Sequence, residues 1–514
     1  MTTGKSRRAR TRTLANRLVL ALLVALAMIA LYGLASILRP ISVTSAAAAR
    51  SAGPLPVNSA LLGCPAPGTG GLLGGGIAQA STPTGGSGGQ VSVTPVAPAG
   101  APPAKKPLSV PSRPGQLVIS SIPAAPSLSA KLAAMPTMAG GLVPTGLAQG
   151  GLMVSATGPA AQGIDVEQLS PAGVPTARCQ QPGSNFWFVL PGSPATHIQL
   201  YLMNTDGQTA DATVSVQTDS GPQLGTPDSG IAVPPHSMVI QDLSKMLRSG
   251  RAISLNVTTS VGRVVAAVRE TTSSGRQGIW LPVAQPPATS QVIAGMPTTA
   301  GQRELYISVP GGNAAQVTVT AITPHGTYQP TGGSGVSLLG HLTTAIAIPS
   351  LTGIPGALKI TANVPVTAVL VVSGGPPGAP GIVLAGTPAL AQQGVVAASP
   401  VGAAGHSELV LSAPGHPARV RIVTVTPGTP IAGQSGRVTT IGAKSSIEVP
   451  IAPPGKSKAT LAAVIVTPLA GSGPVYAAQV AMSGSNVQSV LPVIPSPVSI
   501  RLPHVRESLL TVLG

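Results

Sequence analysis

Two short motifs hold residue types that could do chemistry, but neither has the setting that the chemistry needs. Gly85-Gly86-Ser87-Gly88-Gly89 matches the turn that exposes a nucleophilic serine in many hydrolases. That turn requires a strand before it and a helix after it, whereas both flanks here are of low complexity. Pro454-Gly455-Lys456-Ser457 resembles the end of a phosphate-binding loop, but Pro450 stands where the first glycine belongs and no helix pattern follows. We interpret the first motif as linker and the second as a turn.

The histidines do not show the spacing of metal ligands. Zinc sites draw on close pairs of histidines, or on histidine with cysteine or carboxylate. The seven histidines of this chain are scattered: His197, His236, His325, His341, His406, His416 and His504. We therefore expect them in turns or on the surface, and we expect no catalytic residue, no metal and no cofactor.

The two cysteines, Cys64 and Cys179, are the natural partners for one disulfide in an oxidising compartment. The bridge would close a loop of about 116 residues, to which the chain-entropy description assigns about 4 to 5 kcal/mol of stability. Two unpaired thiols are the alternative. Leu61-Leu62-Gly63-Cys64 resembles a lipoprotein box, but it lies too far beyond the apolar segment at the N-terminus, so we interpret it as a chance match.

The N-terminal residues predict a membrane anchor. Leu18 to Leu38 is an apolar run of 21 residues without a charged side chain, long enough at about 1.5 Å per residue to cross a bilayer core of about 30 Å. The positive-inside rule then keeps residues 1–17 in the cytoplasm and the bulk of the chain outside. Cleavage near Ala48, in a stretch of four alanines, is the alternative and would leave a secreted protein. The basic residues that precede the run are Lys5, Arg7, Arg8, Arg10, Arg12 and Arg17.

Composition indicates folded domains joined to a low-complexity linker. Glycine (63) and proline (55) are abundant, yet the apolar fraction is 43% and the charged fraction only 8%, unlike the composition of disordered chains. The Gly/Pro/Ser runs concentrate in residues 39–115, which we predict to be a linker. The net charge of +17 attracts anionic cell-wall polymers. Nucleic acid is a poor partner because the basic residues are scattered and few aromatics are available for base stacking.

Three sets of landmarks recur in one order and predict three copies of a β domain. Alternating Val/Ile/Thr/Ala runs separated by Gly, Pro and Asp predict half-buried strands. The size of about 100 residues per copy favours immunoglobulin-like sandwiches over propeller blades of about 40 to 50 residues. The landmarks are the turns at Asp206, Pro310 and Pro414, the polar turns at His236, His341 and Lys444, and the strand positions Val264, Val366 and Val475.

The predicted fold is therefore all-β: one N-terminal transmembrane helix, a Gly/Pro-rich linker and tandem sandwich repeats. The predicted parts are a cytoplasmic tail (1–17), a transmembrane helix (18–38), a linker (39–115), a β-like segment joined to the first sandwich (116–185), sandwiches at 186–288, 289–391 and 392–498, and a C-terminal tail (499–514).

Phe186-Trp187-Phe188 holds both phenylalanines and one of the two tryptophans of the chain. In a strand Phe186 and Phe188 point to one face and Trp187 to the other, so one side is core. Trp187 is the candidate surface aromatic, which could stack on a sugar, and packing is the alternative that we favour. Trp280 closes the same repeat, and we expect it to pack against this cluster.

The chain resembles a family of membrane-anchored or secreted actinobacterial proteins, a domain-of-unknown-function family of the cell envelope. The resemblance extends over roughly residues 40–500 and implies an envelope location without an established activity. We expect a non-enzymatic extracytoplasmic scaffold or interaction protein, bound to the membrane through Leu18 to Leu38 and to wall polymers or envelope proteins. The alternative is a binding accessory to cell-wall polysaccharide synthesis or export. The motifs that carry the resemblance are Cys64-Pro65-Ala66-Pro67, Arg178-Cys179-Gln180-Gln181-Pro182 with Phe186-Trp187-Phe188, Val233-Pro234-Pro235-His236-Ser237 and Gly262-Arg263-Val264-Val265-Ala266.

Overall fold

The computed structural model divides into two compact units, one made of Met1–Pro54 with Arg501–Gly514 and the other of Leu55–Ile500. The structure describes residues 22–30, 32, 54–65, 76–82, 89–100, 108–111, 122–123, 150–170, 174–193, 196–223, 229–244, 247, 250–272, 278–299, 301–373, 381–401, 405–425, 436–452 and 461–501.

The first unit is described over residues 22–30 and 32, which are helical and have exposed side chains. Among the described residues, no helix has both the length and the apolar character that crossing a membrane requires. The predicted span, Leu18 to Leu38, includes residues outside the described ones, and it stays a prediction.

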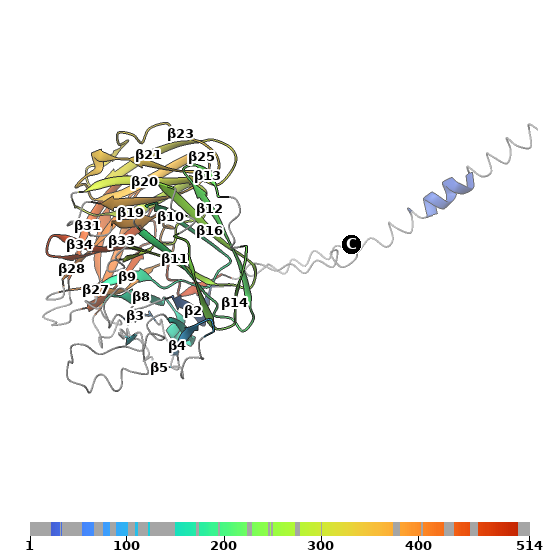
Figure 1. The fold of residues 1–514 in the computed structure, drawn as a ribbon, viewed down its shortest axis with the longest axis horizontal. Coiled ribbons are helices and arrows are strands. Elements are labelled where there is room, and N and C mark those ends of the chain that lie inside the picture. The colour runs from blue at the N-terminus through green and yellow to red at the C-terminus, as the bar shows by residue number, and fades with distance from the viewer. Residues whose placement is uncertain are drawn as a thin grey trace, which may run out of the picture. The chain divides into compact units, whose positions relative to one another are not determined.

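The second unit consists of four β-sandwiches, which we name the N-terminal, first, second and third sandwich (Figure 1). The strands of the N-terminal sandwich are β2 (Ser59–Cys64), β3 (Gly76–Ala80), β4 (Gln90–Pro98), β5 (Leu108–Pro111), β6 (Ile122–Pro123), β7 (Gly151–Thr157), β8 (Asp165–Leu169) and β9 (Pro175–Arg178). Those of the first are β10 (Asn185–Pro191), β11 (Thr196–Met203), β12 (Ala210–Thr218), β13 (Gly221–Pro222), β14 (Ser229–Val233), β15 (Ser237–Asp242), β16 (Ala252–Val261), β17 (Val265–Thr272) and β18 (Gly278–Leu281).

The second and third sandwiches follow the same plan. The second has β19 (Ala288–Met296), β20 (Gln302–Val309), β21 (Ala315–Thr323), β22 (Gly326–Tyr328), β23 (Val336–Leu338), β24 (Leu342–Ala347), β25 (Gly356–Ser373) and β26 (Ile382–Ala385). The third has β27 (Gly394–Pro400), β28 (His406–Ala413), β29 (Ala418–Val425), β30 (Arg437–Ile441), β31 (Ser445–Ile451), β32 (Leu461–Pro468), β33 (Tyr476–Ser483) and β34 (Asn486–Val493). A short pair, β1 (Leu55–Pro56) with β35 (Ser499–Ile500), joins the two ends of the unit.

One strand order recurs in all four sandwiches. In the third, one sheet runs β27-β32-β29-β30 and the other β31-β28-β33-β34, so the first strand of the copy pairs with the sixth and the second with the fifth and seventh. An immunoglobulin constant domain instead places its first, second, fifth and fourth strands in one sheet. The all-β sandwich prediction is thus confirmed as two stacked sheets per copy, whereas the immunoglobulin order is not observed.

The N-terminal sandwich is a fourth copy, which the sequence pattern did not reveal. Its sheets run β2-β7-β4 with β5 beside β4, and β6-β3-β8-β9. A short parallel pairing of β4 with β15 makes the first of these sheets continuous with the β15-β11-β17-β18 sheet of the first sandwich. Residues 39–115, predicted to be a linker, contain β1 to β5, and Val91 and Val93 of β4 are buried. Residues 116–185 do not extend the first sandwich, because β7 pairs with β2 and β4 instead. These strands were hidden because their partners lie far along the chain and Gly-rich segments separate them.

The predicted landmarks occupy equivalent places. The turns at Asp206, Pro310 and Pro414 each follow the second strand of a copy and precede the third. Each valine landmark lies at the start of the segment that pairs with that second strand, as the β11–β17, β20–β25 and β28–β33 ladders show. His236, His341 and Lys444 lie just before β15, β24 and β31, respectively. They have φ of 48°, 59° and 54° and are the non-glycine residues with positive φ in the described part of the chain.

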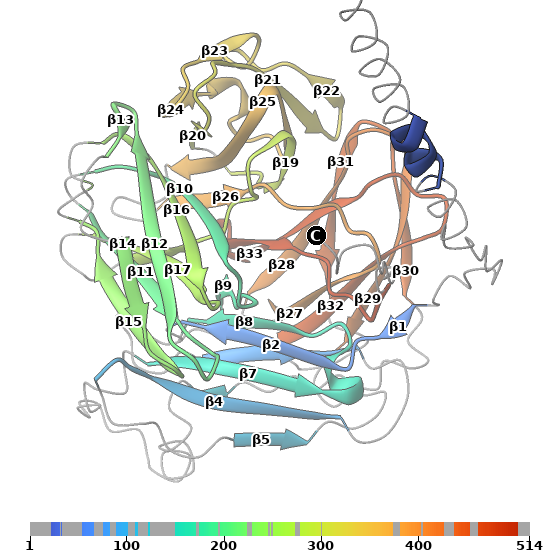
Figure 2. The ribbon, with the colours of Figure 1, turned by 90° about the vertical axis from the view of Figure 1, so that its right-hand side faces the viewer.

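The sheets stack face to face around a common centre (Figure 2). Within each sandwich, the facing sides of its two sheets form an apolar core. The outer face of the β10-β16-β12 sheet packs on the second sandwich at Tyr306 and Val369. We call each interface between neighbouring sandwiches a seam. At the next seam, Val410 and Val480 of the third sandwich pack against the second. Because the N-terminal sandwich contacts both the first and the third, the row of sheets closes into a ring.

The seams use different chemistry at one equivalent position. Met203, on β11 opposite Met238, lies so close to the N-terminal sandwich that a Cβ added to Gly63 would lie 2.2 Å from its Cε. In the second sandwich the position is Ser308, whose hydroxyl lies 2.8 Å from that of Ser254. In the third it is Ser412, which contacts Ser446 of the same sheet at 2.7 Å, and Ser446 donates across the seam to the Ile322 carbonyl oxygen at 2.8 Å. The same seam geometry is therefore formed in one copy by methionine packing against glycine and in the other two by contacts between serine hydroxyls.

The positive φ at Lys444 yields a stability prediction. A non-glycine residue in this region is strained by about 1 kcal/mol or more, and glycine is not. Lys444→Gly should therefore raise the free energy of unfolding by about 1 kcal/mol, while Lys444→Ala, which keeps the Cβ, should leave it nearly unchanged. Chemical denaturation of the two variants and the wild type measures this. Equal effects of glycine and alanine would refute the strain argument.

Candidate functional site

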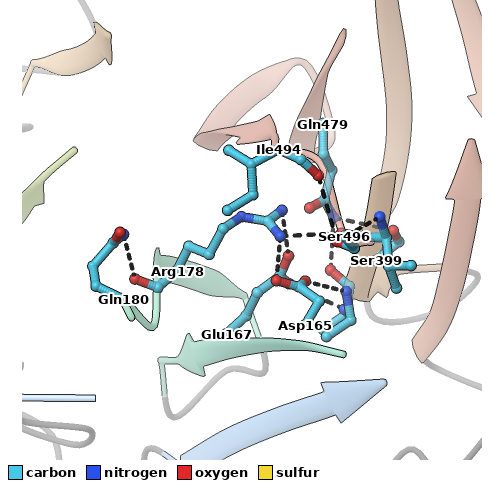
Figure 3. A network of polar contacts seen from close by, with 11 residues as sticks. Asp165, Glu167, Arg178, Gln180, Ser399, Gln479, Ile494 and Ser496 are labelled. Atoms are coloured by element: carbon cyan, nitrogen blue, oxygen red, sulfur yellow. Dashed lines mark hydrogen bonds and ion pairs between the residues drawn. The ribbon is translucent and has the colours of Figure 1, made fainter. Parts of the chain in front are cut away.

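The ring closes where β8 and β9 of the N-terminal sandwich pack on β27 of the third, and a charged cluster is buried there (Figure 3). The Arg178 side chain is 3% exposed, that of Asp165 4% and that of Glu167 0%. Arg178 Nη1 donates to Asp165 Oδ1 and, at 3.0 Å, to the Val395 carbonyl oxygen. Its Nη2 donates to Glu167 Oε1 at 3.1 Å. One guanidinium therefore joins two carboxyl groups to the backbone of a strand more than 200 residues away.

Strand alternation places these side chains on one face. Asp165 and Glu167 are two residues apart on β8, so both point toward β27, while Val166 between them enters the core of the N-terminal sandwich. Arg178 is the cross-strand partner of Glu167 on β9. An arginine directly opposite an acid on one face is the arrangement in which opposite charges attract across an antiparallel pair.

The remaining carboxylate oxygens accept hydrogen bonds from the backbone of β27. The Ala397 N–H donates to Asp165 Oδ2 and the Ala398 N–H to Glu167 Oε2, each at 3.0 Å. Gln479 on β33 then donates to the Ala398 carbonyl oxygen at 2.7 Å. The cluster thus satisfies polar backbone groups of β27 that would otherwise be buried without partners, which is costly.

The surroundings of Glu167 act on its pKa in opposite directions. Burial raises the pKa of the Glu167 carboxyl well above its usual value, the Asp165 carboxylate raises it further, and Arg178 opposes the shift. Arg178 therefore partly offsets the cost of burying two acids in a dry interface, where an unpaired charge is strongly unfavourable.

A disulfide and a backbone bridge involve the two residues that follow Arg178 in the chain. Cys64 and Cys179 are joined, the pairing expected from the sequence, and both are buried. Gly63 and Gln180 exchange backbone hydrogen bonds of 2.7 and 3.0 Å. Equivalent bridges join the first strand of a copy to the segment after its last strand at Trp187 with Ala284, Ile293 with Gly386 and Gly394 with Pro495. The disulfide therefore reinforces, in one copy, a contact that all four copies make.

A second group of titratable side chains lies at the seam between the first and second sandwiches. Tyr306 donates its phenol hydrogen to Glu304 Oε2 at 2.5 Å. Burial, the Glu304 carboxylate and then Glu270 raise the pKa of Tyr306. Burial raises the pKa of Glu270 to about 7, against a hydrogen bond with Thr196. The equivalent Tyr201 donates to Gln199 at 3.2 Å, so a tyrosine bonded to the side chain two residues earlier recurs at two seams.

The aromatic residues singled out from the sequence are packed. Phe186 and Phe188 are in the core of the first sandwich, as alternation predicted. Trp187 is half-buried against the same cluster, and its indole N–H is buried without a hydrogen-bond partner among the described residues. Trp280 does not join these residues. Its ring lies 5.1 Å from that of Tyr201 and 5.8 Å from the Arg269 guanidinium, in the seam with the N-terminal sandwich.

The other motifs contribute no catalytic arrangement within the residues that the structure describes. Six of the histidines lie in described segments, are exposed and are far from one another in the chain. No group of three His, Cys, Asp or Glu side chains that could hold a metal ion occurs in those segments. Most of Gly85 to Gly89, all of Pro454 to Ser457 and His504 lie outside the described residues.

Sequence reasoning identified Cys179 and Arg178 within a motif but overlooked Asp165 and Glu167. A signal was present, because these are the first two acidic residues of the chain and their spacing puts them on one face of a strand. What the cluster can do chemically is hold an interface together.

Residues 133–452 match the family described as Family of unknown function (DUF5719). The matched segment contains the buried charges of β8 and β9 and the β27 backbone that they bind, but Cys64 lies outside it. No curated protein matches the chain.

Removing the guanidinium should open the ring. Arg178→Met leaves two buried acids without a counter-charge, so we expect the free energy of unfolding to fall by about 3 to 5 kcal/mol. The triple variant Asp165→Val, Glu167→Leu, Arg178→Met removes all three groups and should be more stable than the single variant. Chemical denaturation followed by tryptophan fluorescence compares them. A single variant as stable as the wild type would contradict the assignment.

Burial of Glu270 should make stability depend on pH. Its folded-state pKa of about 7 lies above the usual 4.5, so its contribution is complete below about pH 4.5 and is lost as the pH rises through about 7. Glu270→Gln cannot titrate. The loss of unfolding free energy between pH 5 and pH 8 should therefore be smaller in this variant than in the wild type, while Asp219→Asn, at an exposed carboxylate, should behave like the wild type. Parallel denaturation curves at the two pH values measure it; an unchanged slope in Glu270→Gln would count against the buried acid.

Proposed function

This chain belongs to the DUF5719 family of unknown function, and we propose that it is a non-enzymatic scaffold or interaction protein, anchored in the membrane and displayed on the outer side of an actinobacterial cell envelope. The observation that carries the proposal is the pairing of β1 with β35, by which Leu55 faces Ile500. A closed ring whose two ends leave side by side can be displayed on one tether, and the apolar run Leu18 to Leu38 precedes it.

The use of the buried polar groups supports this role. Arg178, Asp165 and Glu167 bind one another and the backbone of β27. Arg303, 2% exposed, donates to the carbonyl oxygens of Pro297, Thr299 and Ile354. Groups that an enzyme would turn toward a substrate are here turned toward the fold. A disulfide between buried cysteines suits an oxidising compartment outside the cytoplasm.

Location and role can be tested together in cells that lack the chain. A reporter that is active only outside the cytoplasm, fused after Gly514 of the full chain, should be active. The fused protein should remain in the membrane fraction and should keep Met1. The full chain should restore a normal envelope to these cells only when it is anchored. A version in which a cleavable secretion signal replaces residues 1–38 should therefore not restore it. Recovery of a soluble product beginning near Ala48 or Ala49 would replace the anchored protein with a secreted one. Loss of function on replacing one exposed acid or histidine, with abundance unchanged, would favour an enzyme over a scaffold.

A further inference from the structure

The third sandwich has two exposed arginines at strand positions where the fold does not require arginine. Arg419 and Arg421 are two residues apart on β29, so they point to the same face, about 7 Å apart along the strand. Both are exposed. In register beside them on the edge strand β30 lie Thr440 and Val438, also exposed, and Thr467 of β32 is opposite Arg421 on the other side.

The other copies show that arginine is not needed for the fold at these places. The third strand begins with a buried alanine in the first, second and third sandwiches, whereas β4 of the N-terminal sandwich begins with the exposed Gln90. Counted from this alanine, the first sandwich has Asp211 and Thr213 where the third has its arginines. The second sandwich has Gln316 and Thr318. The first of these positions therefore accepts an acid or an amide and the second accepts a hydroxyl, so the pair of positive charges in the third sandwich has no counterpart in the first or second.

Part of this face is open, because the side chains of Arg419 and Arg421 are exposed. The inner part of β29 is covered, with Val425 buried against the N-terminal sandwich.

Neither arginine has an acidic partner among the described residues, whereas Arg263 is paired with Asp206 and Arg178 with two acids. The stem of Arg421 lies over Gly436, where an added Cβ would be 2.7 Å from its Cγ. Protection of a sheet edge does not account for the pair, because β29 is bonded on both sides, to β30 and β32.

We infer that the β29–β30 face, formed by Arg419, Arg421, Val438, Thr440 and Thr467, binds an extended anionic polysaccharide. Guanidinium groups bind carboxylate and phosphate oxygens in a bidentate manner, and a row along a strand fits a polymer with a negative group about every 7 Å. The flanking threonine hydroxyls bind polar oxygens. A membrane surface fits less well, since the face has no aromatic side chain and Val438 is its one large exposed apolar residue.

The inference rests on the proposed scaffold role and names its partner class, but the binding test is independent of location. The full chain in non-ionic detergent is titrated with inorganic polyphosphate and with polygalacturonate at a series of salt concentrations. The test variant Arg419→Gln, Arg421→Thr takes residues that the second sandwich has at these positions. The control Lys105→Gln, Lys106→Gln removes the same charge from another part of the sequence.

The test variant should bind polygalacturonate about tenfold or more weakly at low salt, and a loss confined to polyphosphate would overturn the polysaccharide assignment. The slope of log Kd against log salt should fall by about 1.5, from two lost contacts at about 0.7 to 0.9 each. The control should stay within about twofold of the wild type, and both variants should keep its melting temperature. Equal weakening in both variants would show attraction by net charge alone and overturn the site. Unchanged polymer binding, with the loss confined to vesicles of phosphatidylglycerol and phosphatidylcholine, would overturn it in favour of a lipid.

Discussion

Closure between the third and N-terminal sandwiches is the contact on which the ring depends. Each sandwich buries its own core, yet its outer sheet faces are also apolar and are covered by the neighbouring copies. An open row would expose Ala78, Ala80 and Leu169 at one end and Ala397 and Val425 at the other. Burying both faces stabilises the closed form in proportion to the apolar area removed from water. The β1–β35 pair and the buried charges then hold the two ends of the chain together.

The four copies share a strand order but not a seam chemistry. At one equivalent position Met203 packs against glycines, Ser308 meets a hydroxyl of the first sandwich, and Ser412 bonds to Ser446. The backbone geometry is therefore what the copies have in common, and the side chains adapt to it. This explains how Asp, Gln and Arg can follow the same buried alanine on the third strand, and why a charge confined to one copy is informative about binding rather than folding.

How much of the fold and of the charged cluster could be predicted from the sequence depended on how far apart in the chain the interacting residues are. Alternation within a strand and turn residues are local, and they sufficed for three copies, for the landmarks at His236, His341 and Lys444, and for the inward phenylalanines. The fourth copy stayed hidden because β2 and β4 find their partner in β7, beyond a long Gly- and Pro-rich interval. The closing cluster stayed hidden because Arg178 and Val395 are brought together only when the ring closes.

The placement of the buried charges at the closing seam has a physical reason. The seams between successive copies join segments that are close in the chain, whereas the closing seam joins its two ends, and the same faces could pair with a second molecule. Such head-to-tail pairing would not close and would form filaments. Asp165 and Glu167 meet the N–H groups of Ala397 and Ala398 in one register, and any other register would leave charges buried without partners. Apolar contact supplies the attraction at this seam, and the charges restrict it to the one alignment that the closed chain provides.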